Sequence, residues 1–146
     1  MFSRTSEYAL RAMVYLVRHL DEWPVSRRRI ANEAGIPPKY LSTILSSLVR
    51  AGVLESSPGI GGGFAMARPP KEISLEEILK PFESVLGPSR PCPFGNEVCR
   101  DDDPCAGHEL WMHVKETYTQ FLEDTTIHDV SIKRAGGTRS RKRKRR

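Results

Sequence analysis

The chain contains 146 residues, 38% of them hydrophobic, which is enough to build the core of one domain. No apolar run approaches the ~18 residues that a membrane-spanning helix requires, so we expect no membrane partner. Residues 1–80 contain 11 Lys/Arg and 8 Asp/Glu, residues 81–132 contain 3 and 10, and residues 133–146 contain 9 and none. Only the N-terminal half and the C-terminal tail therefore suit a polyanionic partner.

The N-terminal half is predicted to contain three helices. Residues 6–20 form a helix that is apolar on most of its surface and therefore largely buried, and Trp23-Pro24 ends it. Ser26 is a suitable N-cap for a short helix over residues 27–34, and Gly35 is a suitable left-handed C-cap. Pro37-Pro38 opens a third helix, whose apolar residues follow the i, i+3, i+4, i+7 spacing until Gly52 ends it.

The second and third helices, joined by a turn that contains Gly35, are typical of a helix-turn-helix. Hydroxyl groups and a lysine on the outer face of the third helix suit base edges, and the arginines that open the second helix suit phosphates. The alternative is a solvated polar face on a small helical bundle. Strand candidates at residues 53–56 and 64–67 flank a glycine-rich turn, which predicts the wing of a winged helix. The expected DNA contacts are Arg27, Arg28, Arg29, Pro38, Lys39, Tyr40, Ser42, Thr43, Ser46, Gly61, Gly62 and Gly63.

A cysteine-rich loop follows a short helix that opens with a capping box at Ser74 and ends near Lys80, before Pro81. The loop, at residues 87–106, holds all three cysteines of the chain, Cys92, Cys99 and Cys105, and His108 lies just beyond it. Three thiols and an imidazole are four candidate ligands for a soft metal or an iron–sulfur cluster. The odd number of cysteines and the lack of a secretory signal favour a reducing cytoplasm.

A helix over residues 108–122 closes the ordered part of the sequence, and its apolar stripe is bulky and aromatic. We expect this stripe to form a symmetric homodimer, because two-fold dimers bind palindromic operators in double-stranded DNA. The alternative is that the stripe packs on its own subunit. The expected dimer contacts are Leu110, Trp111, Val114, Tyr118, Phe121 and Leu122.

The sequence therefore predicts a mainly α fold with a small β-hairpin. Its parts are a winged helix-turn-helix DNA-binding domain (residues 1–80), a linker helix with the cysteine-rich loop (81–106), a dimerisation helix (107–132) and a disordered basic tail (133–146). Seven of the last eight residues are basic, a composition that cannot build a core. We expect the tail to add non-specific DNA affinity.

Several of these motifs together resemble the iron–sulfur cluster regulator family of winged-helix transcription repressors (the IscR/NsrR/RirA type). The resemblance covers residues 1 to about 130. It lies in Thr5-Ser6-Glu7-Tyr8-Ala9-Leu10-Arg11-Ala12, in the third helix, in the wing sequence Gly59-Ile60-Gly61-Gly62-Gly63-Phe64, in Cys-x6-Cys-x5-Cys-x2-His and in the last helix. It implies a homodimeric, DNA-binding transcription regulator, expected to be a repressor, whose operator affinity depends on a bound cluster that senses redox, nitric oxide or iron status.

Three models compete for the ligand site. The resemblance favours a [2Fe–2S] cluster on Cys92, Cys99, Cys105 and His108, since family members with the Cys-x2-His ending bind one. In the second model the three cysteines hold a [4Fe–4S] cluster with an acidic fourth ligand, and Glu7 stands where some relatives place it, on the partner's N-terminal helix. In the third the same four side chains hold a structural Cys3His zinc ion. The six-residue first gap, in place of five in some members, leaves the cluster type open.

Two other classes of function remain beside the cluster-dependent regulator. An enzyme is disfavoured, because the sequence has no Cys-x2-Cys redox pair, no nucleophile elbow and no paired carboxylates in an apolar setting. The other alternative is a winged-helix DNA-binding protein with a structural zinc site and no sensing role.

Overall fold

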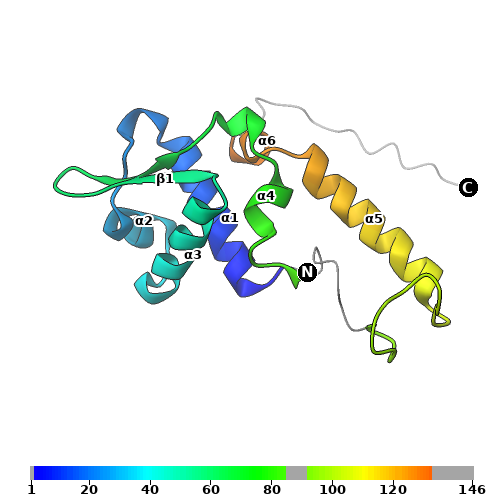
Figure 1. Ribbon diagram of the computed structural model, residues 1–146. Helices are drawn as coiled ribbons and strands as arrows, with labels where there is room; N and C mark the ends of the chain where they lie inside the picture. The colour runs from blue at the N-terminus through cyan, green and yellow to red at the C-terminus, as the bar shows by residue number, and fades with distance from the viewer. Residues whose placement is uncertain (1, 85–91, 133–146) are drawn as a thin grey trace, which may run out of the picture.

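Figure 1 shows a computed structural model of the chain, which describes residues 2–84 and 92–132. The α-helices within these ranges are α1 (Arg4–Arg18), α2 (Arg27–Ala34), α3 (Pro38–Arg50), α4 (Leu75–Leu79), α5 (His108–Asp124) and α6 (Ile127–Ser131). Two 3-10 helices, η1 (Leu20–Glu22) and η2 (Pro70–Glu72), and the strands β1 (Leu54–Ser57) and β2 (Gly63–Met66) complete the elements. The predictions for the basic tail and for residues 87–91 of the loop lie outside the described residues.

The central helix α1 begins two residues earlier than the sequence predicts. Ser3 is its N-cap, and the Ser3 hydroxyl accepts a hydrogen bond from the Ser6 backbone N–H at 3.1 Å. The helix ends at Arg18, and the chain continues as the 3-10 helix η1. Met13 and Leu16 are fully buried, which confirms that α1 forms the centre of the core.

The helix-turn-helix is present as predicted. Ser26 caps α2, and Gly35 ends it at a φ of +65°, a left-handed conformation that favours glycine. Pro38 stands in the first turn of α3, where a missing backbone donor costs little. Leu41, Leu45 and Leu48 on the inner face of α3 are fully buried, so the opposite face is left to solvent.

The predicted wing is an antiparallel pair of strands in which Leu54 lies opposite Met66 and Ser57 opposite Gly63. The base of the wing is also fastened to the segment before α2. The Val25 N–H donates to the Phe64 carbonyl at 2.9 Å, and the Phe64 N–H donates to the Val25 carbonyl at 2.8 Å. This third strand-like segment fixes the direction of the hairpin relative to the helix-turn-helix.

The C-terminal elements return to the same core. The capping box at Ser74 opens α4 as predicted, and a second capping box, between Thr126 and Asp129, opens the unpredicted helix α6. The Leu75 N–H donates to the Thr125 carbonyl, and the Ile127 N–H donates to the Ile73 carbonyl, both at 2.9 Å. These bonds clamp the end of α5 beside the start of α4.

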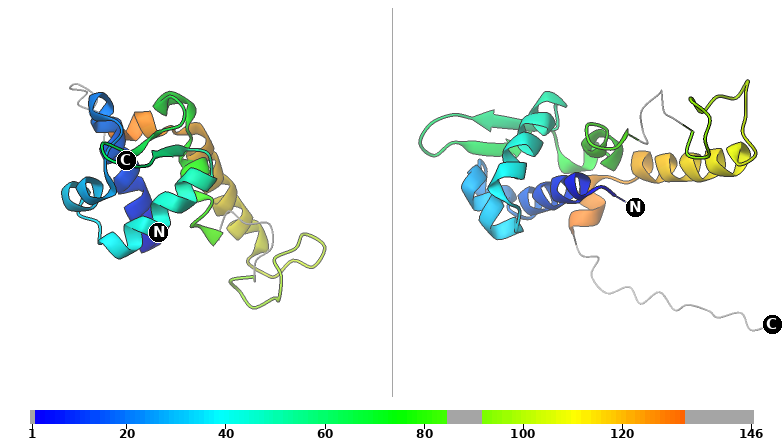
Figure 2. Two further views of the ribbon diagram at one scale, coloured as in Figure 1. Left: turned by 60° about the vertical axis from the view of Figure 1, so that its left-hand side comes forward. Right: turned by 90° about the horizontal axis from the view of Figure 1, so that it is seen from below.

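From this clamp α5 extends away from the winged helix and carries the cysteine-rich loop at its outer end (Figures 1 and 2). The observed architecture is therefore mainly helical with one β-hairpin, which confirms the predicted fold class. Within the described part of the chain, none of the helices combines the length and the apolar composition needed to cross a membrane.

Candidate metal centre and nucleic-acid interface

The four predicted metal donors lie at the outer end of α5 as two pairs. In the first pair the Sγ atoms of Cys92 and Cys105 are 3.4 Å apart. In the second, Cys99 Sγ lies 3.5 Å from Nδ1 of His108. Across residues 2–84 and 92–132, no three side chains of His, Cys, Asp or Glu gather at one point as a single metal ion would require.

His108, the first residue of α5, is oriented by a carboxylate that the sequence analysis did not single out. Its Nε2 atom lies 2.9 Å from Oδ1 of Asp101, and the residue is only 8% exposed. When Nε2–H donates to this carboxylate, Nδ1 carries the lone pair that faces Cys99. Imidazoles that bind metals are held by their other nitrogen in this way, so the arrangement suits a ligand.

The two sulfurs of the first pair differ in environment. Backbone hydrogen bonds at Asn96 and Phe94 lower the pKa of the Cys92 thiol, and the Phe94 N–H lies 3.4 Å from its sulfur. The hydrogen bond to Cys92 raises the pKa of the Cys105 thiol, and burial adds to the effect. The contact between the two sulfurs therefore accompanies pKa shifts of opposite direction in Cys92 and Cys105.

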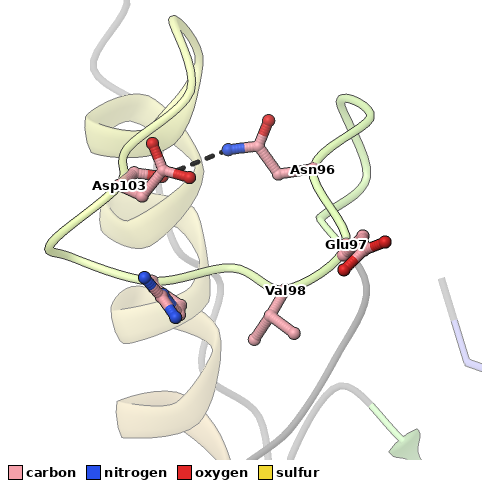
Figure 3. A pocket seen from close by; sticks show the side chains of 5 residues that line it. Asn96, Glu97, Val98 and Asp103 are labelled. Atoms are coloured by element: carbon pink, nitrogen blue, oxygen red, sulfur yellow. Dashed lines mark hydrogen bonds between the residues drawn. The ribbon is translucent and has the colours of Figure 1, made fainter.

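The loop around the donors is held in shape by its own polar contacts. The Asn96 side-chain amide donates to the Asp103 carbonyl at 3.1 Å and joins the two limbs of the loop (Figure 3). Residues Asn96, Glu97, Val98, Arg100 and Asp103 line a hollow of about 350 Å³. The acidic residues of this loop, Glu97, Asp101, Asp102 and Asp103, are exposed to solvent.

The four donors are compatible with an iron–sulfur cluster. A [2Fe–2S] cluster takes two protein ligands on each iron, and the loop offers two pairs. Glu7, the alternative fourth ligand, is exposed in the first turn of α1, and no hydrogen bond or ion pair joins it to the loop within the described residues. A role for Glu7 would require it to act on the loop of another subunit.

The outer face of α3 presents the predicted DNA-binding residues to solvent. Lys39, Tyr40, Thr43 and Ser46 are exposed, and Ser42 is half-buried. The Arg27 guanidinium donates to the Ser42 hydroxyl at 3.0 Å, which links α2 to α3. Between these helices lies a hollow of about 260 Å³, and two of the residues that line it are arginines. The lining residues are Arg27, Arg28, Ala31, Asn32 and Pro38.

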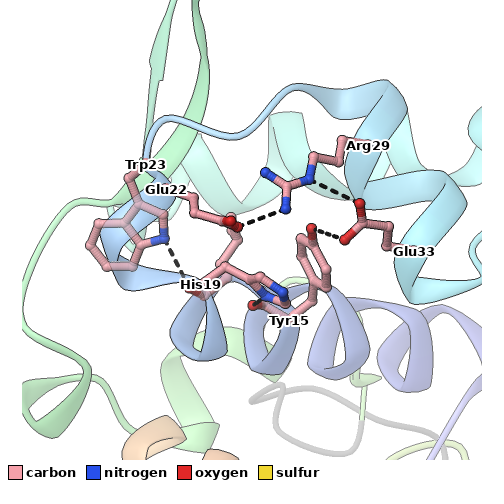
Figure 4. Close-up of polar contacts among 7 residues, drawn as sticks. Tyr15, His19, Glu22, Trp23, Arg29 and Glu33 are labelled. Atoms are coloured by element: carbon pink, nitrogen blue, oxygen red, sulfur yellow. Dashed lines mark hydrogen bonds and ion pairs between the residues drawn. The ribbon is translucent and has the colours of Figure 1, made fainter.

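Arg29, also predicted to contact DNA, is held in ion pairs with two glutamates of its own subunit, and its DNA contact stays a prediction. The guanidinium lies between Glu22, at 2.7 Å, and Glu33, at 2.9 Å (Figure 4). Arg29 and Glu33 are four residues apart and share the side of α2 that faces α1. The Tyr15 hydroxyl of α1 donates to Glu33 at 2.5 Å, so these residues hold the two helices together.

This network shifts the ionisation of its members. Burial raises the pKa of Tyr15 to about 12, and the hydrogen bond to Glu33 adds to the effect. The hydrogen bonds from Tyr15 and then Arg29 lower the pKa of Glu33. The carboxylate form of Glu33 and the phenol form of Tyr15 are thus the states that the fold selects.

The three wing glycines, all predicted to approach DNA, occupy different places. Gly61 is at the tip with open space around it, at a φ of +76°. Gly63 lies at the base, where a Cβ atom would be 2.3 Å from the Val25 carbonyl oxygen. A Cβ at Gly62 would lie 2.1 Å from the carbonyl oxygen of Ser57, across the hairpin. Gly62 and Gly63 are therefore required by the hairpin itself, whatever their part in DNA binding.

The predicted dimer residues divide into three groups by their exposure. Leu110, Val114 and Phe121 are 78%, 56% and 50% exposed. Leu122 is instead fully buried in the core of its own subunit, so its assignment to the dimer surface is wrong. Leu122 is about 100° around the helix from Phe121, on the side that packs against the core where α5 ends. Trp111 and Tyr118 are half-buried, with the rings of Phe94 and Phe2 at centroid distances of 6.4 and 6.0 Å.

Three features are typical of a winged helix-turn-helix DNA-binding protein: the exposed polar face of α3 (the recognition helix), the β1–β2 wing that pairs with Val25, and the hollow lined by Arg27 and Arg28. They place the chain in the transcription-regulator class. Residues 2–132 match the Rrf2 family, described as an iron-dependent transcriptional regulator, and the chain belongs to that family. This confirms the predicted relationship, and the relatives are transcription regulators, in agreement with the prediction that the chain is not an enzyme.

Individual relatives carry two different names. The HTH-type transcriptional regulator IscR of Pectobacterium carotovorum is 30% identical over 84% of this chain and 74% of its own length. CymR of Bacillus subtilis is 30% identical over 88% of each chain. Among solved structures, T. potens IscR superimposes with a TM-score of 0.71 at 28% identity, over 89% of this chain and 85% of the other. The structure of CymR, the global cysteine regulator of B. subtilis, superimposes with a TM-score of 0.73 at 26% identity, over 90% of this chain and 95% of the other.

Proposed function

We propose that this regulator is a homodimeric repressor whose affinity for a palindromic operator depends on a [2Fe–2S] cluster bound by Cys92, Cys99, Cys105 and His108. The observation that carries the proposal is the division of these donors into two pairs. Each iron of such a cluster needs two protein ligands. A structural zinc ion needs four donors around one point, a requirement that the paired arrangement meets less well.

The residues of the loop have separate tasks in this proposal. The bound cluster supplies a redox-active centre that reacts with small oxidants. Asp101 holds the Nε2–H of His108 and leaves Nδ1 free as a ligand. The Phe94 N–H lies against the Cys92 sulfur and favours its anionic form. Because His108 is the first residue of α5, its ligation joins the loop to this helix.

The homodimer is supported by the exposed apolar stripe on α5. Leu110 and Val114 are one turn apart, and Phe121 continues the same side of the helix one heptad beyond Val114. Three large apolar side chains, each at least half exposed, are costly to leave in water. A second copy of the same stripe would cover them and place two recognition helices on one operator.

The cluster is tested by purifying the full-length protein without oxygen and measuring its visible absorption, iron, sulfide and zinc content. We expect sulfur-to-iron charge-transfer bands with two irons and two sulfides per chain. His108→Ala is expected to lose or shift these bands, whereas His113→Ala, an exposed histidine further along α5, leaves them unchanged. A colourless protein with one zinc per chain contradicts the proposal.

The sensing role is tested by operator titrations of the same preparation with and without its cluster. We expect the two forms to differ in operator affinity by at least tenfold, which corresponds to ~1.4 kcal/mol of coupling between the sites. An unrelated DNA of the same length is the control, because the difference should be smaller there. Equal operator affinity in both forms would leave a DNA-binding protein with no sensing role.

A further inference from the structure

The three thiols of the loop have different neighbours: two of the sulfurs lie against each other, and the third lies against an imidazole. Cys92 and Cys105 have their sulfurs 3.4 Å apart, whereas Cys99 faces His108 at 3.5 Å. A disulfide bond requires about 2.05 Å between sulfurs, so the first pair needs a closure of little more than 1 Å. Cys92 and Cys105 are thus both proposed cluster ligands and the pair of cysteines best placed to form a disulfide.

The backbone around this pair keeps the two sulfurs together. The Cys92 N–H donates to the Asn96 carbonyl at 3.0 Å and the Gly95 N–H donates to the Cys92 carbonyl at 3.2 Å, which folds the first limb into a turn. Asn96 then ties this limb to Asp103, two residues before Cys105. Neither cysteine lies inside a helix or strand, so the small movement that a bond requires breaks no regular element.

We infer that, in the protein without its cluster, Cys92 and Cys105 form an intramolecular disulfide under mild oxidation, while Cys99 stays a free thiol. The disulfide would occupy two of the four cluster ligands and prevent the loop from taking up a new cluster until it is reduced. Only this last consequence rests on the proposed function, because the oxidation itself requires no metal.

Hydrogen peroxide is the oxidant for which we write the reaction. One thiolate of the pair attacks an oxygen of the peroxide, the O–O bond breaks, and hydroxide leaves and takes up a proton to form water. The resulting sulfenic acid is attacked by the second sulfur. The S–S bond forms as the S–O bond breaks, and a second water leaves with the proton of the second thiol. Two thiols and one peroxide give one disulfide and two waters.

The pairing can be mapped because the sequence offers suitable cleavage sites. Full-length protein, freed of metal with a chelator, is treated with one equivalent of peroxide, alkylated and digested with trypsin. Cleavage after Arg100 separates Cys92 and Cys99 from Cys105. Further cleavage after Glu97 separates Cys92 from Cys99. We expect the peptides of Cys92 and Cys105 to be linked in most molecules and Cys99 to carry the alkyl label.

Single substitutions provide matched controls. Cys99→Ser should form the disulfide at a rate within twofold of the natural sequence, whereas Cys92→Ser and Cys105→Ser should form no intramolecular bond. A dominant disulfide that includes Cys99, or a dominant bond between subunits on a non-reducing gel, would overturn the inference.

A final measurement separates this inference from the proposed function. The oxidised protein is incubated with ferrous iron and sulfide, with and without a dithiol reductant. We expect cluster absorption only with the reductant. If the disulfide maps to Cys92 and Cys105 and neither sample becomes coloured, the proposed cluster is wrong and the thiol pair stands. Equal colour in both samples refutes the blocking role of the disulfide.

Discussion

Replacement of Gly63 by alanine tests whether the wing is held by its base. The added Cβ would lie 2.3 Å from the Val25 carbonyl oxygen and 2.4 Å from its carbon, and both are backbone atoms that cannot rotate away. The strand must separate from Val25, which breaks the two hydrogen bonds between Val25 and Phe64. Each such bond contributes ~1 kcal/mol net. With residual strain of about 1 kcal/mol, we expect a loss of about 2–4 kcal/mol in unfolding free energy.

The measurement is urea unfolding of Gly63→Ala and of a control at the wing tip, Gly61→Asn. Gly61 has a φ of +76°, no atom lies within 4 Å of the point that a Cβ would occupy there, and asparagine tolerates the left-handed conformation. The control should therefore lose less than about 1 kcal/mol. If Gly63→Ala unfolds within about 0.5 kcal/mol of the natural protein and yet binds DNA weakly, Gly63 serves DNA directly and the structural account fails.

Three further predictions concern the surface and the polar network. Arg28→Ala should lower the slope of log affinity against log salt by about 0.9. Arg29→Ala should leave this slope unchanged and lower the unfolding free energy. Equal slopes for the two variants contradict the distinction between a phosphate contact at Arg28 and a structural role at Arg29. The lowered pKa of Glu33 stabilises the fold above the ordinary carboxyl value of 4.5, and this contribution is lost as the pH falls through the folded-state pKa. Tyr15→Phe should therefore lose stability at neutral pH and show a shallower acid limb in urea titrations, and an unchanged limb would rule out the hydrogen bond as the cause. Val114→Lys should convert the dimer to a monomer in sedimentation experiments, whereas a lysine on the opposite side of α5, at Glu116, should not; a dimeric Val114→Lys protein refutes the proposed interface.

Local signals in the sequence are sufficient for much of the fold. The caps of α2 at Ser26 and Gly35 and the capping box at Ser74 depend on residues within one or two turns, and the structure has them where predicted. The predicted start of α1 is two residues late because Ser3, Thr5 and Ser6 are all able to cap a helix. The chemistry of the chosen cap, a hydroxyl that accepts the Ser6 N–H, is visible only in three dimensions.

The features that the sequence did not predict all depend on distant partners. Nothing near Val25 indicates that it pairs with Phe64, and nothing near Asp101 indicates that its carboxylate orients His108. Arg29 looks like any basic residue at a helix start until Glu22 is found beside it. Leu122 lies about 100° around the helix from Phe121, and only the packing at the end of α5 shows that this side of the helix faces the core.

The length of α5 limits how the loop, in its proposed sensing role, can affect the DNA-binding surface. The helix has 17 residues and therefore spans about 25 Å. In physiological salt the field of an exposed charge decays over about 8 Å. The length of α5 is roughly three times this screening length, so the field of one charge at its outer end is weak at the winged helix. If the loop senses as proposed, a change of charge there has little direct effect on the winged helix of the same subunit. A movement of α5 about its clamped end is then the signal that we expect to reach the DNA-binding surface.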